Sequence, residues 1–299
     1  MCGIVGLLIK NERMRPELGR LMLPMFQCMA ERGPDSAGVA VFQEPLKKNL
    51  RRFSLLAPAL DYDWDALAKD FKKQTGLECE IEARANHGVL ISPIATEKLN
   101  AWLGENRLPL HLLSAGRALD LYKDMGNAAE IAARYRFAEL SGSHCIGHTR
   151  MATESAVTTD GAHPFTTGPD QCLVHNGSLS NHNALRRELI RQGLSFQTEN
   201  DTEVAAGYMS WRMREGASLE QTLNASLTAL DGFYTFVVGT ETGFGVLRDP
   251  IACKPAVMAE TDRWVAFGTE YRALVDLPGI DIARVWEPTP AKAYLWELN

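Results

Sequence analysis

The sequence lacks the features that mark several large classes of protein. Its six cysteines are scattered and include no C-x-x-C pair, which argues against a structural zinc site and against the disulfide framework of a secreted protein. No stretch approaches the roughly 18 consecutive apolar residues of a transmembrane helix. The N-terminus has no basic segment followed by a long apolar run, as a signal peptide would. We therefore expect a cytoplasmic protein without a membrane partner.

The sequence also has no large excess of positive or negative charge. The 31 Lys and Arg residues are balanced by 37 Asp and Glu residues, and the net charge is −6, so we expect no nucleic-acid partner. The sequence contains no P-loop and no GxGxxG motif. His144 and His148 are four residues apart, but in the strand expected there their side chains lie about 13 Å from each other. We therefore expect no metal site.

What is present is a globular composition. The chain has 299 residues, of which 45% are apolar and 23% charged, enough for one large domain or two ordinary ones with a sizeable core. Residues 2–9 form an apolar run typical of a buried strand. Apolar residues then recur at helical spacing from Leu18 to Met29, with Pro24 inside the pattern, so a kink or a late start is expected there. A second strand is predicted near Val39–Phe42.

Residues from about 45 to 142 have a different character. Asp63 can cap a helix that runs to Lys73, with Gly76 just past its end. Residues 77–83 alternate as a strand would, and residues 128–140 have the composition of a helix. No recognisable chemistry falls in this stretch, so we interpret it as an inserted α+β subdomain.

From residue 145 onward apolar strands and amphipathic helices resume, which indicates a layered α+β domain. We predict strands at 145–148, 171–175, 233–239, 244–247, 265–268 and 293–298, and helices at 181–192, 201–215 and 219–230.

Cys2 is the most informative residue of the chain. If Met1 is removed, Cys2 carries a thiol and a free α-amine, and an amine with a pKa of about 7.7–8.0 can act as the local base for the thiol. Such a nucleophile needs no histidine. Taken alone, however, a cysteine on a first strand is more often a small buried apolar residue.

The segments at the predicted strand ends decide between these readings. They are Met1-Cys2-Gly3-Ile4-Val5-Gly6, Glu31-Arg32-Gly33-Pro34-Asp35-Ser36, Gly147-His148-Thr149-Arg150-Met151-Ala152-Thr153, His163-Pro164-Phe165, His175-Asn176-Gly177-Ser178 and Glu199-Asn200-Asp201-Thr202. Together and in this order they closely resemble the class II glutamine amidotransferases, which are N-terminal-nucleophile hydrolases. The resemblance covers residues 1–42 and about 145–270. It implies a four-layer αββα sandwich, here with the insertion at about 45–142, within one amidotransferase domain spanning residues 1–299.

The resemblance implies a substrate site for glutamine or another γ-glutamyl amide. Arg150, helped by Thr153, is expected to bind the α-carboxylate through its forked guanidinium. Asp201, at the start of a predicted helix, is expected to bind the α-ammonium. His163 is expected at the substrate site, organising its loop by hydrogen bonds, since the chemistry already has its base.

The remaining expected roles concern the nucleophile. The side chain of Asn176 and the backbone N–H of Gly177 resemble the oxyanion hole, in which Gly177 allows close approach because it has no Cβ. Arg32 is expected to pack against Cys2, as the first Arg-Gly loop does in the family. The Cys2 amine would protonate the departing ammonia and leave a γ-glutamyl thioester for water to hydrolyse.

Members of the family join this domain to a synthase that consumes the ammonia, and nothing in the sequence is left over for one. The chain resembles the amidotransferase domain of glutamate synthase as a separate subunit of a hetero-oligomer. That resemblance implies no cofactor on this chain, and FMN and iron–sulfur clusters on glutamate-synthase-like partner subunits. Three alternatives stay open: a free-standing γ-glutamyl amide hydrolase, a γ-glutamyl transferase to amines, and, if Met1 is retained, a silent scaffold subunit.

Overall fold

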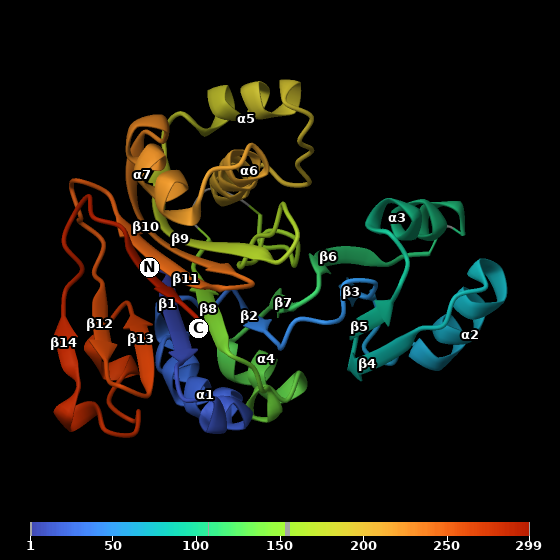
Figure 1. The fold of residues 1–299 in the computed structure, drawn as a ribbon, viewed down its shortest axis with the longest axis horizontal. Helices are drawn as coiled ribbons and strands as arrows, with labels where there is room; N and C mark the ends of the chain where they lie inside the picture. Colours follow the sequence, from blue (N-terminus) through green and yellow to red (C-terminus); the bar gives the residue numbers. More distant parts are fainter. Residues whose placement is uncertain (1, 107, 153–155, 299) are drawn as a thin grey trace.

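The computed structural model describes residues 2–106, 108–152 and 156–298, in which two large antiparallel sheets face each other and a third sheet lies to one side (Figure 1). The larger sheet has seven strands in the order β14-β12-β13-β1-β8-β2-β7. These strands are β1 (Gly3–Ile9), β2 (Ser36–Phe42), β7 (Leu119–Met125), β8 (His144–Arg150), β12 (Val257–Glu260), β13 (Trp264–Gly268) and β14 (Arg284–Trp286).

The second sheet has four strands in the order β15-β11-β10-β9. They are β9 (Gln171–Leu179), β10 (Gly232–Thr240), β11 (Gly243–Arg248) and β15 (Tyr294–Glu297). The outer face of this sheet is covered by α5 (His182–Arg191), α6 (Asp201–Arg214) and α7 (Leu219–Ala229), whereas α1 (Leu18–Cys28) and α4 (Ala128–Arg134) cover the seven-stranded sheet (Figure 1).

Three apolar cores hold these layers together. Between the sheets, Ile4, Leu8 and Ile146 of one pack against residues such as Val174 and Val237 of the other. A second core lies under α1 and α4, and a third lies between the second sheet and helices α5, α6 and α7. The predicted four-layer αββα sandwich is therefore confirmed.

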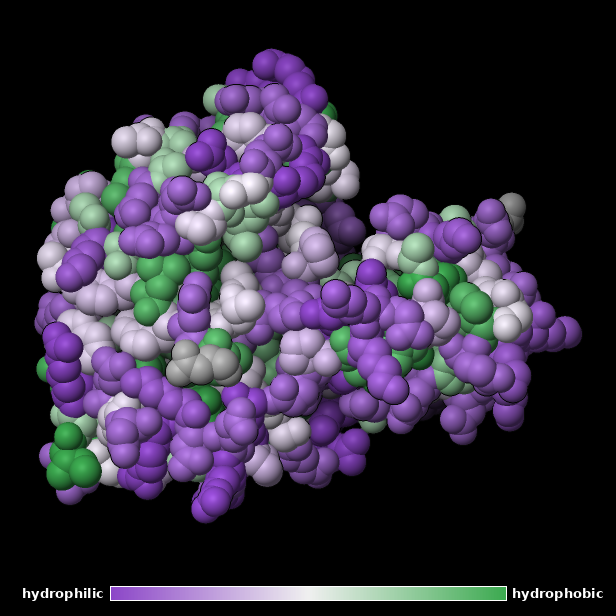
Figure 2. Space-filling model, in the orientation of Figure 1, coloured by the Kyte–Doolittle hydropathy of each residue, from purple (hydrophilic) through white to green (hydrophobic). Residues whose placement is uncertain are grey.

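The third sheet, in the order β4-β5-β3-β6, forms the subdomain that projects from the main body (Figures 1 and 2). It consists of β3 (Arg51–Leu56), β4 (Glu80–Arg84), β5 (His87–Ser92) and β6 (His111–Gly116), with α2 (Trp64–Thr75) and α3 (Thr96–Glu105) packed on it around an apolar core of its own. Asp63 caps α2 and Gly76 ends it in the left-handed conformation, as predicted.

The boundary of the insertion requires a correction. The separate sheet ends at Gly116, and β7 pairs with β2 along its whole length, from Ser36 opposite Met125 to Phe42 opposite Leu119. Residues 119–142 therefore belong to the main body and not to the insertion expected at 45–142. The helix expected at 128–140 is also shorter, since α4 ends at Arg134 and Arg136 has a φ of 51°.

Short 3₁₀ helices complete the chain, at Glu12–Glu17, Ala30–Arg32, Phe137–Glu139, Tyr271–Ala273 and Ile280–Ile282. Pro24 lies inside α1, which keeps its buried apolar face toward the sheet. In the described part of the chain, no helix is both long enough and apolar enough to span a bilayer.

Candidate functional site

A cavity of about 280 Å³ opens where the two large sheets end next to each other. Strand β1 brings Cys2 to this edge, and β8 brings Arg150, because Gly3 pairs with Thr149 in the register of the sheet. The second sheet and α6 complete the wall. The lining residues are Cys2, Arg150, Met151, His163, His175, Gly177, Ser178, His182, Glu199, Asn200, Asp201 and Thr202.

Cys2 is held by its backbone. Its carbonyl oxygen accepts hydrogen bonds from Nε of Arg32 at 3.1 Å and from Nδ2 of Asn176 at 3.2 Å, while its Sγ lies 3.8 Å from the carbonyl oxygen of Met151. The next residue, Gly3, has no room for a side chain, since a Cβ there would lie 2.7 Å from Cβ of Met29. The expected contact of Arg32 with Cys2 is present.

Arg32 is itself positioned by the segment that follows β13. It forms an ion pair with Glu270, which also pairs with Arg272 at 2.6 Å. The charges and hydrogen bonds of these two arginines outweigh the effect of burial and hold the pKa of Glu270 below its usual value. Thr269 also contacts β1, since its hydroxyl oxygen accepts a hydrogen bond from the N–H of Ile4 at 2.8 Å. Sequence reasoning missed Glu270, which looks like an ordinary surface charge.

Asn176 and Gly177 lie in β9, where the strand passes Cys2. The φ of Gly177 is +154°, and a Cβ at this position would lie 2.0 Å from the carbonyl oxygen of Phe233 and 2.8 Å from Nε2 of His175. Only glycine fits there, and Gly177 lines the cavity. Asn176 is predicted to belong to an oxyanion hole, and the structure adds that its amide donates to the carbonyl oxygen of Cys2.

Arg150 ends β8 and is almost fully buried. The loop after it is fastened to the loop before β2: the N–H of Asp35 donates to the carbonyl oxygen of Arg150 at 3.1 Å, and the Asp35 carboxylate accepts the N–H of Ala152 at 2.7 Å. Asp35 therefore sets the direction of the segment that carries Arg150. The predicted partner of Arg150, Thr153, lies outside the described residues.

Asp201 places a carboxylate in the wall of the cavity, as its neighbour Glu199 also does. Its carboxylate accepts the N–H of Leu179 at 2.9 Å and lies 3.7 Å from Nδ1 of His175. Burial alone would raise the pKa of Asp201, but these contacts lower it to about 2. The side chain is therefore a carboxylate at neutral pH and faces the same space as Arg150 and Cys2.

Three buried histidines form the wall behind Asp201. Nε2 of His163 and Nδ1 of His175 lie 2.8 Å and 3.1 Å from the hydroxyl oxygen of Thr202, and the ring of His148 stacks on His163 with 4.0 Å between centroids. Burial lowers the pKa of His148 to about 3 and also lowers that of His163, so both rings are neutral at pH 7. The expectation that His163 organises its loop by hydrogen bonds agrees with this geometry. From the sequence, His175 is expected, like His163, to organise a loop by hydrogen bonds, whereas His148 and Thr202 were not singled out as site residues.

No group of three or more His, Cys, Asp or Glu residues within the described ranges is arranged to hold a metal ion. The cavity brings together the Cys2 thiol, the Arg150 guanidinium and the carboxylates of Asp201 and Glu199.

Comparison with known proteins gives the following matches. A family model described as a glutamine amidotransferase domain matches residues 148–276. The chain is 52% identical over 298 residues to the glutamine amidotransferase-like protein GlxB of Rhizobium meliloti, with 99% of this chain and 98% of that protein covered. A protein of Methanothermobacter thermautotrophicus is 31% identical over 325 residues, with 100% of both chains covered.

Among solved structures, the glutamine phosphoribosylpyrophosphate amidotransferase of B. subtilis superposes with a TM-score of 0.63 at 20% identity, covering 99% of this chain and 47% of that chain. At this identity the similarity is one of fold.

Proposed function

The chain belongs to the class II glutamine amidotransferases, and from this premise we propose that Cys2 attacks the side-chain amide of glutamine. The observation that carries the proposal is the shared cavity of about 280 Å³, in which the Cys2 thiol, the Arg150 guanidinium and the Asp201 carboxylate meet. Glutamine presents an electrophilic amide, an anion and a cation. The cavity offers a matching group to each.

Recognition of the substrate rests on the two charged side chains. Arg150 can bind the α-carboxylate through two parallel N–H groups, which a lysine could not do. Asp201, whose pKa is lowered to about 2, provides a permanent anion for the α-ammonium. Because the two charges are opposite and lie in one cavity, they orient an amino acid rather than a simple amide.

The chemical step follows from the nucleophile and its neighbours. With Met1 removed, the α-amine of Cys2 accepts the thiol proton as Sγ forms a bond to the amide carbon. The resulting oxyanion is stabilised by the Asn176 amide and the Gly177 N–H. The amine then returns the proton to the leaving nitrogen, the C–N bond breaks, and ammonia departs from a γ-glutamyl thioester. Water hydrolyses the thioester to glutamate and restores the thiol.

The acceptor of the ammonia is proposed to be another protein. The two large sheets with their helices and the inserted subdomain occupy the described chain. Two proteins that it matches over almost their whole length are described as amidotransferase-like and as a putative glutamine amidotransferase. We place the chain as the amidotransferase subunit of a glutamate-synthase-like hetero-oligomer, with N-methylglutamate synthase as the specific candidate. FMN and iron–sulfur clusters would then belong to the partner subunits.

The test uses 6-diazo-5-oxo-norleucine, a glutamine-shaped thiol alkylator, followed by intact-mass measurement. We expect the wild-type chain to lack Met1 and to carry one adduct. Cys253→Ala, which removes an exposed cysteine, should react equally, and Cys2→Ala should not react. A chain that keeps Met1 and takes no adduct would contradict the proposal and favour a silent scaffold. Ammonia release from glutamine, measured with and without partner subunits, separates a gated subunit from a free-standing hydrolase.

A further inference from the structure

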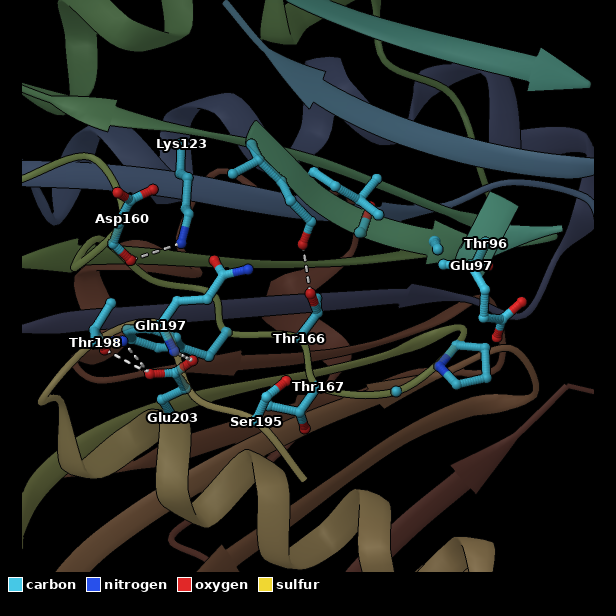
Figure 3. Close-up of a pocket in the computed structure, with 17 residues that line it drawn as sticks. Thr96, Glu97, Lys123, Asp160, Thr166, Thr167, Ser195, Gln197, Thr198 and Glu203 are labelled. Carbon is cyan, nitrogen blue, oxygen red and sulfur yellow. Dashed lines mark hydrogen bonds between the residues drawn. The ribbon is translucent and has the colours of Figure 1, made fainter. Parts of the chain in front are cut away.

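A second cavity, of about 370 Å³, lies between the inserted subdomain and the loops that border the amidotransferase site (Figure 3). Its walls come from β6, from residues 165–169 and from residues 195–198, together with Lys123 of β7 and Glu203 of α6. Sites for small molecules usually enclose roughly 300–1,000 Å³. The second cavity is therefore large enough for a small metabolite, and the amidotransferase mechanism makes no use of it.

Lys123 is the one cation among the described residues that line this cavity. The side chain is 5% exposed, and its ammonium donates to the carbonyl oxygens of Asp160 and Ala162, at 3.0 Å each. It also lies 4.8 Å from the centre of the Phe165 ring. An ammonium carries three N–H donors, so one remains for a ligand. Burial lowers the pKa of Lys123 to about 8, which leaves the group mostly charged at pH 7.

Ser114 adds a second donor. Its hydroxyl is buried on the wall of the cavity and has no hydrogen-bond partner among the described residues. A buried hydroxyl without a partner costs free energy that a ligand oxygen would recover. Lys123 and Ser114 both line the cavity, and a carboxylate has two oxygens that accept hydrogen bonds.

The carboxylates of the cavity have separate roles. Both oxygens of Glu203 are occupied by its own loop, because they accept the N–H groups of Gln197 and Thr198 and the hydroxyl of Thr198. Asp160, in contrast, is partly exposed and lies beside Lys123, while Glu97 is exposed at the other end of the cavity (Figure 3). The Asp160 carboxylate also lies 3.5 Å from Nδ1 of His111.

We propose that the second cavity binds a free amino acid, with its carboxylate on Lys123 and Ser114 and its ammonium toward Asp160. A simple carboxylate would bring a second negative charge next to Asp160, and a simple amine would leave the buried donors unused. The zwitterion satisfies both ends.

Residues 160–165 and residues 197–203 contribute side chains to the walls of both cavities. We therefore infer that the second cavity is a regulatory site, and this part of the inference rests on the proposed function. Lys123 holds the carbonyl oxygens of residues 160 and 162, on the loop whose His163 reaches Thr202 in the amidotransferase site. Glu203 follows Thr202 directly and fastens residues 197 and 198. A ligand that binds the Lys123 ammonium can therefore shift the loop at residues 160–163 and, through His163 and Thr202, the position of Asp201.

The test is calorimetric titration of the full chain after its amidotransferase site has been blocked with 6-diazo-5-oxo-norleucine. The probes are L-alanine, L-aspartate and L-lysine, with acetate and ethylamine as half-ligands. We expect at least one amino acid to bind saturably and at least tenfold more tightly than acetate or ethylamine. Lys123→Met should weaken that binding at least tenfold, whereas Lys98→Met, which removes an exposed lysine next to Glu97, should leave it unchanged.

Absence of saturable binding by all three amino acids, or unchanged binding to Lys123→Met, would overturn the inference. Ser114→Val provides a second variant if Lys123→Met does not fold, and it should weaken binding severalfold. The mass of the blocked protein is measured first. If no adduct forms, the result counts against the proposed function and not against the second site. The titration is then run on the unblocked chain, and the effect of Lys123→Met on amino-acid binding still tests the inference.

Discussion

The side-chain amide of Asn176 lies 3.2 Å from the carbonyl oxygen of Cys2, although 174 positions separate the two residues in the sequence. Arg32 donates to the same oxygen from a third segment of the chain. The backbone of the proposed nucleophile is thus held before any substrate arrives. Since the Asn176 amide has two N–H donors, the second is available to an oxyanion.

Asn176→Ala should lower the kcat for ammonia release from glutamine by about 10²–10³-fold, the usual cost of losing one oxyanion donor. The KM should change much less, because the α-carboxylate and α-ammonium keep their partners. Asn224→Ala on the exposed face of α7 serves as the control. A KM effect larger than the kcat effect would assign Asn176 to substrate binding instead.

Arg150→Lys should raise the KM for glutamine by roughly 10–100-fold, because a point charge cannot fork onto a carboxylate. Steady-state kinetics of ammonia release measure this directly, and Arg187→Lys, at an exposed position of α5, is the matched control. If the KM of the Arg150 variant is unchanged, the carboxylate is bound elsewhere.

Glu270→Gln should lower kcat about tenfold at nearly constant KM, because Glu270 acts on Cys2 only through Arg32, and a hydrogen bond to a charged group contributes about 1.5–3 kcal/mol. The rate of alkylation by 6-diazo-5-oxo-norleucine should fall in parallel. Glu270→Asp should restore part of the rate. Glu31→Gln is the control, since Glu31 also faces Arg272 but its side chain is 85% exposed.

Asp201 should make folding stability depend on pH in the acid range. Its pKa in the folded protein is about 2, below the ordinary value of 3.8, so its contribution is present above pH 4 and is lost as the pH falls toward 2. The difference corresponds to about 2 kcal/mol. Urea unfolding between pH 5 and 2 should therefore show a shallower loss for Asp201→Asn than for the wild type, and parallel curves would refute the assignment.

Local signals in the sequence were enough to predict the parts of the fold that depend on short-range chemistry. The cap at Asp63 and the glycine at Gly76 define α2, and the apolar run after Cys2 defines β1. Strands β12 and β14, four and three residues long, were not predicted. The end of α4 was missed because nothing in the sequence marks Arg136 for a positive φ.

The candidate site likewise contains residues that the sequence predicts and residues that it does not. Arg150, Asn176 and Asp201 could be predicted because the motifs around them resemble those of the class II glutamine amidotransferases, and their side-chain types match the charges and oxygens of glutamine. Glu270 could not, because its significance arises from contact with Arg32 across 238 positions. Lys123 was missed for a similar reason, since its partners are backbone carbonyls that no sequence pattern marks.

The place of β1 between β8 and β13 ties the two halves of the chain together. The Cys2 carbonyl oxygen is held by Arg32 and Asn176, and residues 5–9, which follow it, pair with residues 264–268. A fragment that ends before Glu270 lacks the carboxylate that holds Arg32. The surroundings of Cys2 are therefore assembled only when both halves of the chain have joined one sheet.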